Sequence, residues 1–324
     1  MPVDQQLRAA VVGCGGAGAN HTAGYRRAAG AELVAVCDLD KTRADSLAAE
    51  YDVASYADLS GMLSEADPDV VSVATPEKHH VDPTVTALES GADVLCEKIM
   101  AASVADGRRM VAAAEETSGT LAVDYNYRHM PSFSRIAQAI ESGEIGDVDL
   151  VSADAHAYGW HHVLDLLVYL LGEPESVHAS LNHDPTDVAE QFRLDDVLYV
   201  PSSVATATLA FDGGALATVS ASMNTSLDDH LIDLAVYGSA GRVRLTGMTP
   251  GDSTGTVASG PLADELRGVE SVSLDESFEL SVEAFVDAVR DGRDPPTTGA
   301  DGLRRLELER AVVESAESSE WVSL

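Results

Sequence analysis

The chain has 324 residues and a mass of 33.9 kDa, and its 54 acidic residues outnumber 20 Lys and Arg, which gives a formal net charge of −34. A surface this negative repels phosphate backbones and anionic lipids, so we expect neither nucleic acid nor a membrane surface as a partner. Hydrophobic residues make up 45 %, enough for folded cores, and the length predicts about two domains. No apolar run approaches a bilayer span, the N-terminus lacks a signal-peptide core, and the three cysteines suit a reducing compartment, so we expect a cytoplasmic protein.

The basic residues are nearly all arginine, because only Lys41, Lys78 and Lys98 are lysines. In molar salt, surface charges are screened over a short distance, so the self-repulsion of an acidic surface costs little. Carboxylates hold water and cations under those conditions, whereas lysine stems only add apolar area. The composition therefore predicts a halophilic protein of a salt-loaded cytoplasm, with an ordinary acidic enzyme as the alternative.

The first 124 residues alternate short apolar runs with amphipathic stretches. The predicted strands are Leu7–Val12, Glu32–Cys37, Val70–Ala74, Val94–Cys96 and Leu121–Val123, and the predicted helices are Ala17–Ala29, Lys41–Tyr51, Val81–Ser90 and Val104–Thr117. Continuous apolar strands separated by helices are typical of a parallel sheet that is buried on both faces. We therefore predict an α/β domain with a doubly wound parallel sheet over residues 1–124.

Residues 125–324 follow a different pattern. The predicted helices are Pro131–Ser142, His162–Leu171, Phe278–Arg290 and Gly302–Ser318, and the predicted strands are Ser203–Phe211, Ala215–Met223, Leu231–Val236 and Val243–Thr246. The Asp212-Gly213 pair predicts a hairpin between the first two strands, and the polar stretch Gly247–Pro261 predicts a loop. Strands grouped between helices favour an α+β domain with a mainly antiparallel sheet.

The run from Val11 to Gly18 contains a G-x-G-x-x-G pattern directly after the first predicted strand. Such glycines permit a tight turn, close approach of a pyrophosphate, and close packing of helix on strand, as in a Rossmann domain. Asp38 follows Gly18 by 20 residues, where a carboxylate binds the adenosine ribose and repels a 2′-phosphate. We therefore expect NAD, with NADP as the alternative because Arg43 lies nearby. The expected phosphate-binding residues are Gly13, Gly15, Gly16, Ala17 and Gly18.

Two more loops are expected at the carboxyl ends of the parallel strands, the edge that lines a ligand crevice. Thr75, Pro76 and His80 follow the third apolar run, and the histidine either contacts a cofactor or caps the next helix. Glu97 and Lys98 follow the fourth run. Because the chain otherwise avoids lysine, we interpret Lys98 as a donor to a substrate oxygen.

A third cluster lies between His156 and Asp165. His162 and Asp165 are three residues apart and share a helix face, and histidine titrates near neutrality, which suits the proton transfer that accompanies hydride transfer. Two alternatives stay open: a histidine merely buried at a helix start, and a metal held by His156, His161 and His162. We expect no metal, because the sequence has no H-E-x-x-H pattern.

Together these residues resemble the glucose–fructose oxidoreductase / inositol dehydrogenase / MocA family over nearly the whole chain. The matching features, in the family's order, are the glycine loop, Asp38, Thr75-Pro76 with His80, Glu97-Lys98, Tyr127-Arg128 with Pro131, Gly143-Glu144-Ile145-Gly146, His162 with Asp165, Glu283–Arg290, Pro295-Pro296, residues 302–316 and Trp321-Val322. The resemblance implies an NAD(P)-dependent oxidoreductase of sugars, polyols or related hydroxy and keto compounds. It also implies a homodimer or homotetramer.

The resemblance assigns roles to single residues. Lys98 would hydrogen-bond the reacting oxygen, His162 would act as general acid and base, and Asp165 would orient the substrate or the histidine. Thr75, Pro76, His80 and Glu97 would contact the cofactor, and Arg128, Tyr158 and His161 would contact the substrate.

This chain departs from the family's pattern at three places. Ile99 replaces the proline that usually follows the Glu-Lys pair, often with a cis bond, and Tyr158 replaces the aspartate four residues before the catalytic histidine. The stretch between Gly146 and His162 is short, which leaves open whether His161 or His162 is the acid and base. Two other functions therefore stay open: a redox-neutral enzyme that retains NAD, as in glycoside-cleaving relatives, and a non-catalytic dinucleotide-binding regulator.

Overall fold

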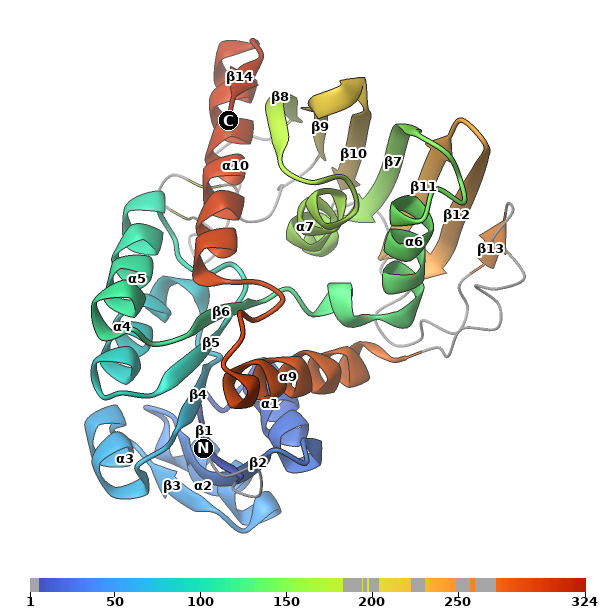
Figure 1. The fold of residues 1–324 in the computed structure, drawn as a ribbon. Coiled ribbons are helices and arrows are strands. Elements are labelled where there is room, and N and C mark those ends of the chain that lie inside the picture. Colours follow the sequence, from blue (N-terminus) through green and yellow to red (C-terminus); the bar gives the residue numbers. More distant parts are fainter. Residues whose placement is uncertain are drawn as a thin grey trace. The chain divides into compact units, whose positions relative to one another are not determined.

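The apolar runs of the first half form a six-stranded parallel sheet with the order β3-β2-β1-β4-β5-β6 (Figure 1). The structure is a computed structural model that describes residues 6–182, 194, 197, 204–222, 231–248, 257–259 and 272–324. The chain divides into two units, Met1–Asn126 with Phe278–Leu306 and Tyr127–Ser277 with Glu307–Leu324.

The first unit alternates strands and helices as the sequence predicts. Its strands are β1 (Leu7–Val12), β2 (Ala31–Cys37), β3 (Ala54–Tyr56), β4 (Val70–Val73), β5 (Asp93–Glu97) and β6 (Leu121–Asp124). Its helices are α1 (Gly16–Arg27), α2 (Lys41–Tyr51), α3 (Leu59–Ala66), α4 (Val81–Glu89) and α5 (Val104–Thr117), joined by the part of α9 (Leu274–Asp291) that follows residue 277. The predicted doubly wound parallel sheet is confirmed.

The core of the first unit shows why its strands read as continuous apolar runs. Every residue of β4 is buried, as a strand in the middle of a parallel sheet must be when helices cover both faces. Phe285 and Val286 of α9 join the same apolar cluster as Leu7 and Tyr25. The sequence analysis did not predict β3, because it has only three residues, none of them fully buried. It also did not predict the helix α3 that follows.

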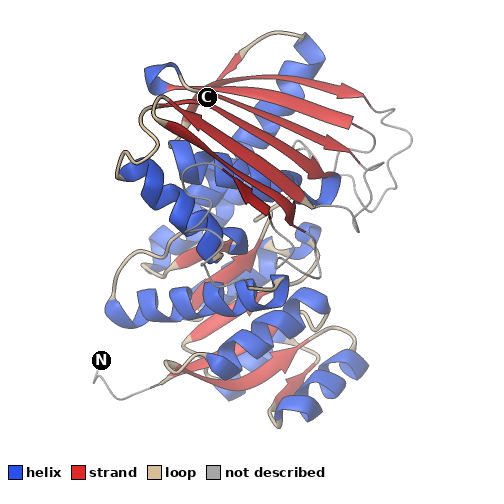
Figure 2. Ribbon diagram, turned by 90° about the vertical axis from the view of Figure 1, so that its right-hand side faces the viewer, coloured by secondary structure: helices blue, strands red, loops and turns tan. Residues whose placement is uncertain are grey.

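The second unit contains an eight-stranded sheet with the order β13-β12-β11-β7-β10-β9-β8-β14, whose long strands run side by side in Figure 2. Only the β7–β10 pair is parallel among these described strands, so the predicted, mainly antiparallel sheet is confirmed. The strands are β7 (Val148–His156), β8 (Pro174–Asn182), β9 (Val204–Phe211), β10 (Leu216–Ser222), β11 (Ile232–Gly238), β12 (Gly241–Met248), β13 (Val257–Ser259) and β14 (Val322–Ser323). The helices are α6 (Pro131–Glu141), α7 (Trp160–Leu171) and the part of α10 (Gly299–Ser318) that follows residue 306.

One face of this sheet packs on helices. Val151 and Ala153 of β7 share an apolar cluster with residues of α6, α7 and α10, while the alternate positions of β7 are more exposed. The predicted hairpin at Asp212 joins β9 and β10. The predicted loop Gly247–Pro261 is wrong at residues 247–248, which belong to β12, and at Val257–Ser259, which form β13. Its other residues, and Ser203 and Met223, lie outside the described residues. Within the described parts of the chain, none of the helices combines the length and the apolar character that a bilayer crossing requires.

Candidate active site

The glycine loop between β1 and α1 uses its glycines in two ways. Gly13 has a φ of +96°, and a Cβ there would lie 2.4 Å from the carbonyl oxygen of Ala74. A Cβ on Gly18 would lie 1.8 Å from the carbonyl oxygen of Gly13, so helix and strand meet here without room for a side chain. Gly15 and Gly16 instead face open space, with no heavy atom within 4 Å of the Cβ positions. The open side of the loop is therefore available to a ligand.

The start of α1 and the end of β2 supply the polar groups for that ligand. Gly15 is the N-cap of α1 and provides no side-chain cap, so the first helical amides, beginning with those of Gly16 and Ala17, point out of the helix end. Asp38 accepts the backbone N–H of Cys14 through Oδ2 at 2.8 Å and the N–H of Asp40 through Oδ1 at 2.8 Å. These bonds fix a carboxylate beside the loop. A pyrophosphate on the helix end and a ribose on Asp38 fit this arrangement.

The loop after β4 is tied to the loop after β5 by a buried histidine. The Nδ1 of His80 lies 3.0 Å from the carbonyl oxygen of Ile99, and its Nε2 lies 2.6 Å from that of Thr75. His80 is fully buried, and burial lowers its pKa. Pro76 precedes the short helical turn Glu77–His79. The ring of His80 thus holds two backbone segments together.

Glu97 and Lys98 lie at the carboxyl end of β5. Glu97 is 6 % exposed, and its Oε2 accepts the backbone N–H of Lys98 at 3.0 Å. Lys98 itself is partly buried. The Lys98–Ile99 peptide is cis, at the position where the family usually has a proline.

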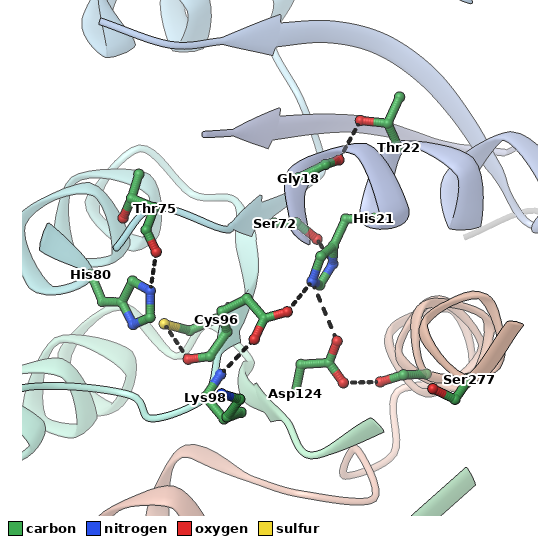
Figure 3. A network of polar contacts seen from close by, with 12 residues as sticks. Gly18, His21, Thr22, Ser72, Thr75, His80, Cys96, Lys98, Asp124 and Ser277 are labelled. Carbon is green, nitrogen blue, oxygen red and sulfur yellow. Dashed lines mark hydrogen bonds and ion pairs between the residues drawn. The ribbon is translucent and has the colours of Figure 1, made fainter. Parts of the chain in front are cut away.

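Two residues that the sequence analysis missed complete this end of the sheet. His21 of α1 and Asp124 of β6 are buried beside Glu97, and the Nε2 of His21 lies 3.0 Å from Glu97 Oε1 and 3.3 Å from Asp124 Oδ2 (Figure 3). Burial raises the pKa of Asp124 to about 7, with the charge of Glu97 adding to the effect. The sequence did hold a signal for Asp124. It ends an apolar run, as Glu97 does, and the carboxyl ends of parallel strands lie at one edge of the sheet, so the two carboxylates could have been expected side by side.

In the second unit, the first turn of α7 carries the predicted acid and base. The ring of His162 stacks on that of Tyr127, with centroids 3.8 Å apart and planes 9° apart. One turn later, Asp165 pairs with Arg128, which makes two hydrogen bonds of 2.5 Å to the carboxylate. Tyr158, where the family has an aspartate, is 42 % exposed. The structure thus gathers four of the predicted residues, Arg128, Tyr158, His162 and Asp165, around the start of α7.

The side chain of His161 has different partners from that of His162. Its Nδ1 lies 2.7 Å from Oε1 of Glu309, and the indole N–H of Trp160 donates to Oε2 of the same carboxylate at 2.9 Å. All three side chains are buried. His156 accepts the backbone N–H of Tyr158 through Nδ1. The histidines considered as alternative metal ligands therefore have separate protein partners.

Comparison with known families and proteins agrees with this geometry. The model described as "Oxidoreductase family, NAD-binding Rossmann fold" matches residues 7–125, and the model of the family's C-terminal alpha/beta domain matches residues 158–324. D-apiose dehydrogenase of Paraburkholderia graminis is 26 % identical over 351 residues, covering 99 % of this chain and 90 % of the relative. Inositol 2-dehydrogenase 1 of Saccharopolyspora erythraea is 39 % identical over 153 residues, 45 % of this chain and 44 % of its own.

A solved structure shares the fold over nearly the full length of the match. An oxidoreductase of Agrobacterium radiobacter, solved with NAD+, L-tartaric acid and magnesium, superposes with a TM-score of 0.84 at 22 % identity and covers 98 % of both chains. The family models assign NAD binding to the first unit's sheet and oxidoreductase activity to the family. The chain belongs to the Gfo/Idh/MocA family of NAD-binding oxidoreductases.

Proposed function

We propose that this protein is an NAD-dependent dehydrogenase that oxidises a sugar, a polyol or a related hydroxy compound, or reduces the matching keto compound. One observation carries the proposal: the glycine loop follows β1, Asp38 follows β2 and Lys98 follows β5, so all three stand at the carboxyl edge of one parallel sheet. The names of the relatives, which act on apiose and inositol, support the substrate class.

Lys98 and His162 divide the proton chemistry in this proposal. The ammonium of Lys98 donates a hydrogen bond to the oxygen on the reacting carbon, and His162 takes the hydroxyl proton during oxidation or returns it during reduction. The nicotinamide of bound NAD supplies the hydride chemistry. Asp165, which is bonded to Arg128, orients the substrate or His162, and the exposed Tyr158 contacts the substrate.

NAD is preferred over NADP because Asp38 is already held by two backbone amides and would repel a 2′-phosphate. Asp38→Ala should weaken NAD binding about tenfold and narrow the preference over NADP, with binding measured by calorimetry. Glu50→Gln, which removes one negative charge from the neighbouring helix α2, is the control and should change neither affinity. A variant at Asp38 that binds both cofactors as the parent does would contradict this assignment.

The sequence also supports a proposal about the domains, the assembly and the cellular setting of the enzyme. We propose residues 1–124 as the dinucleotide-binding domain and residues 125–324 as the domain for substrate binding and for assembly into a homodimer or homotetramer, except that residues 278–306 pack in the first unit. The net charge of −34 and the three lysines support work in the salt-loaded cytoplasm of a halophile. Light scattering in molar KCl tests the assembly state, and a monomer would contradict it.

The test of function is turnover. The purified protein with NAD and a panel of sugars and polyols should form NADH, which is followed by absorbance. Lys98→Ala and His162→Ala should each lower kcat/KM at least about 100-fold, the scale of a lost acid or base, while NAD affinity stays unchanged. NAD binding without turnover would favour a regulator instead, and turnover of a glycoside without net NADH would favour a redox-neutral enzyme; either result contradicts the proposal.

A further inference from the structure

Three ionisable side chains are buried together beneath the loop that carries Lys98. His21 is 0 %, Asp124 1 % and Glu97 6 % exposed. Glu97 and Asp124 are the last residues of β5 and β6 and stand opposite each other in the register of these strands. His21 enters from α1, with its Nε2 within 3.3 Å of an oxygen from each carboxylate (Figure 3). An imidazole thus lies between two carboxylates away from water.

Both ring nitrogens of His21 act as donors. The hydroxyl of Ser72 donates to the hydroxyl of Tyr25 at 2.9 Å, so its oxygen is the acceptor for Nδ1 of His21 at 3.1 Å. The other nitrogen, Nε2, faces only carboxylate oxygens in this network. An imidazole that donates from both nitrogens is an imidazolium.

The electrostatic surroundings of His21 agree with that charge. Burial alone would lower the pKa of His21, but the hydrogen bond to Glu97 and the charges of Asp124 and Glu97 raise it. Burial likewise opposes the charge of Glu97, whose pKa is nevertheless lowered by the hydrogen bond to His21 and by the nearby charges of His21, Lys98 and His80. His21 therefore supplies the cation that keeps two neighbouring carboxylates compatible.

Glu97 connects this cation to the lysine. Its Oε1 contacts His21 at 3.0 Å, and its Oε2 accepts the backbone N–H of Lys98 at 3.0 Å. Asp124 is held from its other side, where the hydroxyl of Ser281 donates to Oδ1 at 2.6 Å. A continuous path of charge-assisted bonds thus runs from α1, the helix that opens the glycine loop, to the main chain of Lys98.

We propose that His21 is a positioning residue for Lys98: its positive charge holds Glu97 and Asp124 side by side, and Glu97 in turn fixes the backbone from which the lysine projects. This inference rests on the proposed function, because the position of Lys98 affects the rate only if Lys98 acts in the reaction. Without the cation, two carboxylates face each other in a dry site, so the side chain of Glu97 must rotate away or one of the two carboxylates must take up a proton. Rotation of Glu97 releases the amide of Lys98, and protonation of Glu97 weakens the hydrogen bond to that amide.

A double-mutant cycle distinguishes the effect of the positive charge of His21 from the effect of its side-chain shape. His21→Gln keeps a polar side chain but removes the cation, and it should lower kcat about tenfold while the Kd for NAD stays within about twofold. Asp124→Asn added to His21→Gln removes the second carboxylate as well, and it should restore kcat to within about threefold of the parent. A double variant as slow as His21→Gln would overturn the proposal.

Three controls complete the experiment. Met62→Ala truncates a fully buried side chain of α3, so it should lower the stability but leave kcat unchanged. A tenfold loss of kcat in Met62→Ala would mean that the effect of His21→Gln is merely structural, and it would overturn the proposal. Lys98→Ala distinguishes the two proposals. If Lys98→Ala is active, the proposed role of Lys98 is refuted and the positioning role of His21 with it. If Lys98→Ala is inactive while His21→Gln is fully active, only the positioning role is refuted. Elemental analysis that finds a stoichiometric divalent metal bound to the parent would also overturn the positioning role of His21, since the metal would then be the cation between Glu97 and Asp124.

Discussion

Arg128 and Asp165 form a bidentate ion pair, with Nε 2.5 Å from Oδ2 and Nη2 2.5 Å from Oδ1. Their side chains are 10 % and 1 % exposed, so the pair is nearly removed from water. The guanidinium also lies 5.3 Å from the ring centre of Tyr169. Because Arg128 directly follows Tyr127, which stacks on His162, the pair fixes the surroundings of the proposed acid and base.

Asp165→Asn should lower the free energy of unfolding by about 3–5 kcal/mol, because it removes the counter-charge of a buried arginine. Urea unfolding followed by circular dichroism measures the change. The double variant Arg128→Met/Asp165→Leu should recover much of the loss, since a buried ion pair is often replaced by apolar residues at little cost. Equal midpoints for Asp165→Asn and the parent would show that the pair contributes nothing.

His161 and His162 form a matched pair of neighbours with different expected effects. His161 bonds the buried carboxylate of Glu309, so His161→Ala should cost about 1.5–3 kcal/mol of stability and leave kcat of the folded protein close to that of the parent. His162→Ala should cost at least about 100-fold in kcat/KM with a smaller change in stability. Kinetics and urea unfolding on both variants decide the assignment, and the opposite pattern would make His161 the acid and base.

The elements that the sequence predicts well depend on local patterns. β1 and α2 begin and end where expected, because β1 is a continuous apolar run and Asp40 caps α2 by accepting the N–H of Thr42. β7 was missed although it lies inside the second sheet. Its buried positions include Ala153 and Ala155, whose small side chains give a weak alternation against the polar residues between them.

The partners of the site residues were less predictable than the residues themselves. Glu309 meets Trp160 and His161 across almost half of the chain, and Ser281 meets Asp124 across a similar distance. No local spacing encodes such contacts, because they depend on how whole elements pack. The sequence therefore indicates the edge of the sheet where we propose the active site, while the pairing of charges there comes only from the structure.

Gly16 and Gly18 should respond differently to alanine. A Cβ on Gly18 would overlap the carbonyl of Gly13 at 1.8 Å, so Gly18→Ala should both destabilise the first unit and abolish NAD binding. A Cβ on Gly16 meets nothing within 4 Å, so Gly16→Ala should leave the melting temperature unchanged and weaken NAD binding by about tenfold or more through contact with the ligand. Calorimetry and thermal unfolding separate the two, and unchanged NAD affinity in Gly16→Ala would place the pyrophosphate elsewhere.

The net charge of −34 predicts that stability rises with salt. At low ionic strength the carboxylates repel one another over about 10 Å or more, whereas at about 1 M the Debye length falls to about 3 Å and the repulsion largely disappears. The free energy of unfolding should therefore increase from low to molar KCl, measured as the urea midpoint at each concentration.

The salt in this experiment should be a chloride, because sulfate and phosphate stabilise folded proteins by exclusion from any surface. The buried pair Arg128–Asp165 is shielded from that screening, so the loss caused by Asp165→Asn should be nearly the same at both ends of the series. A midpoint that does not move with KCl would contradict adaptation to salt and leave an ordinary acidic enzyme.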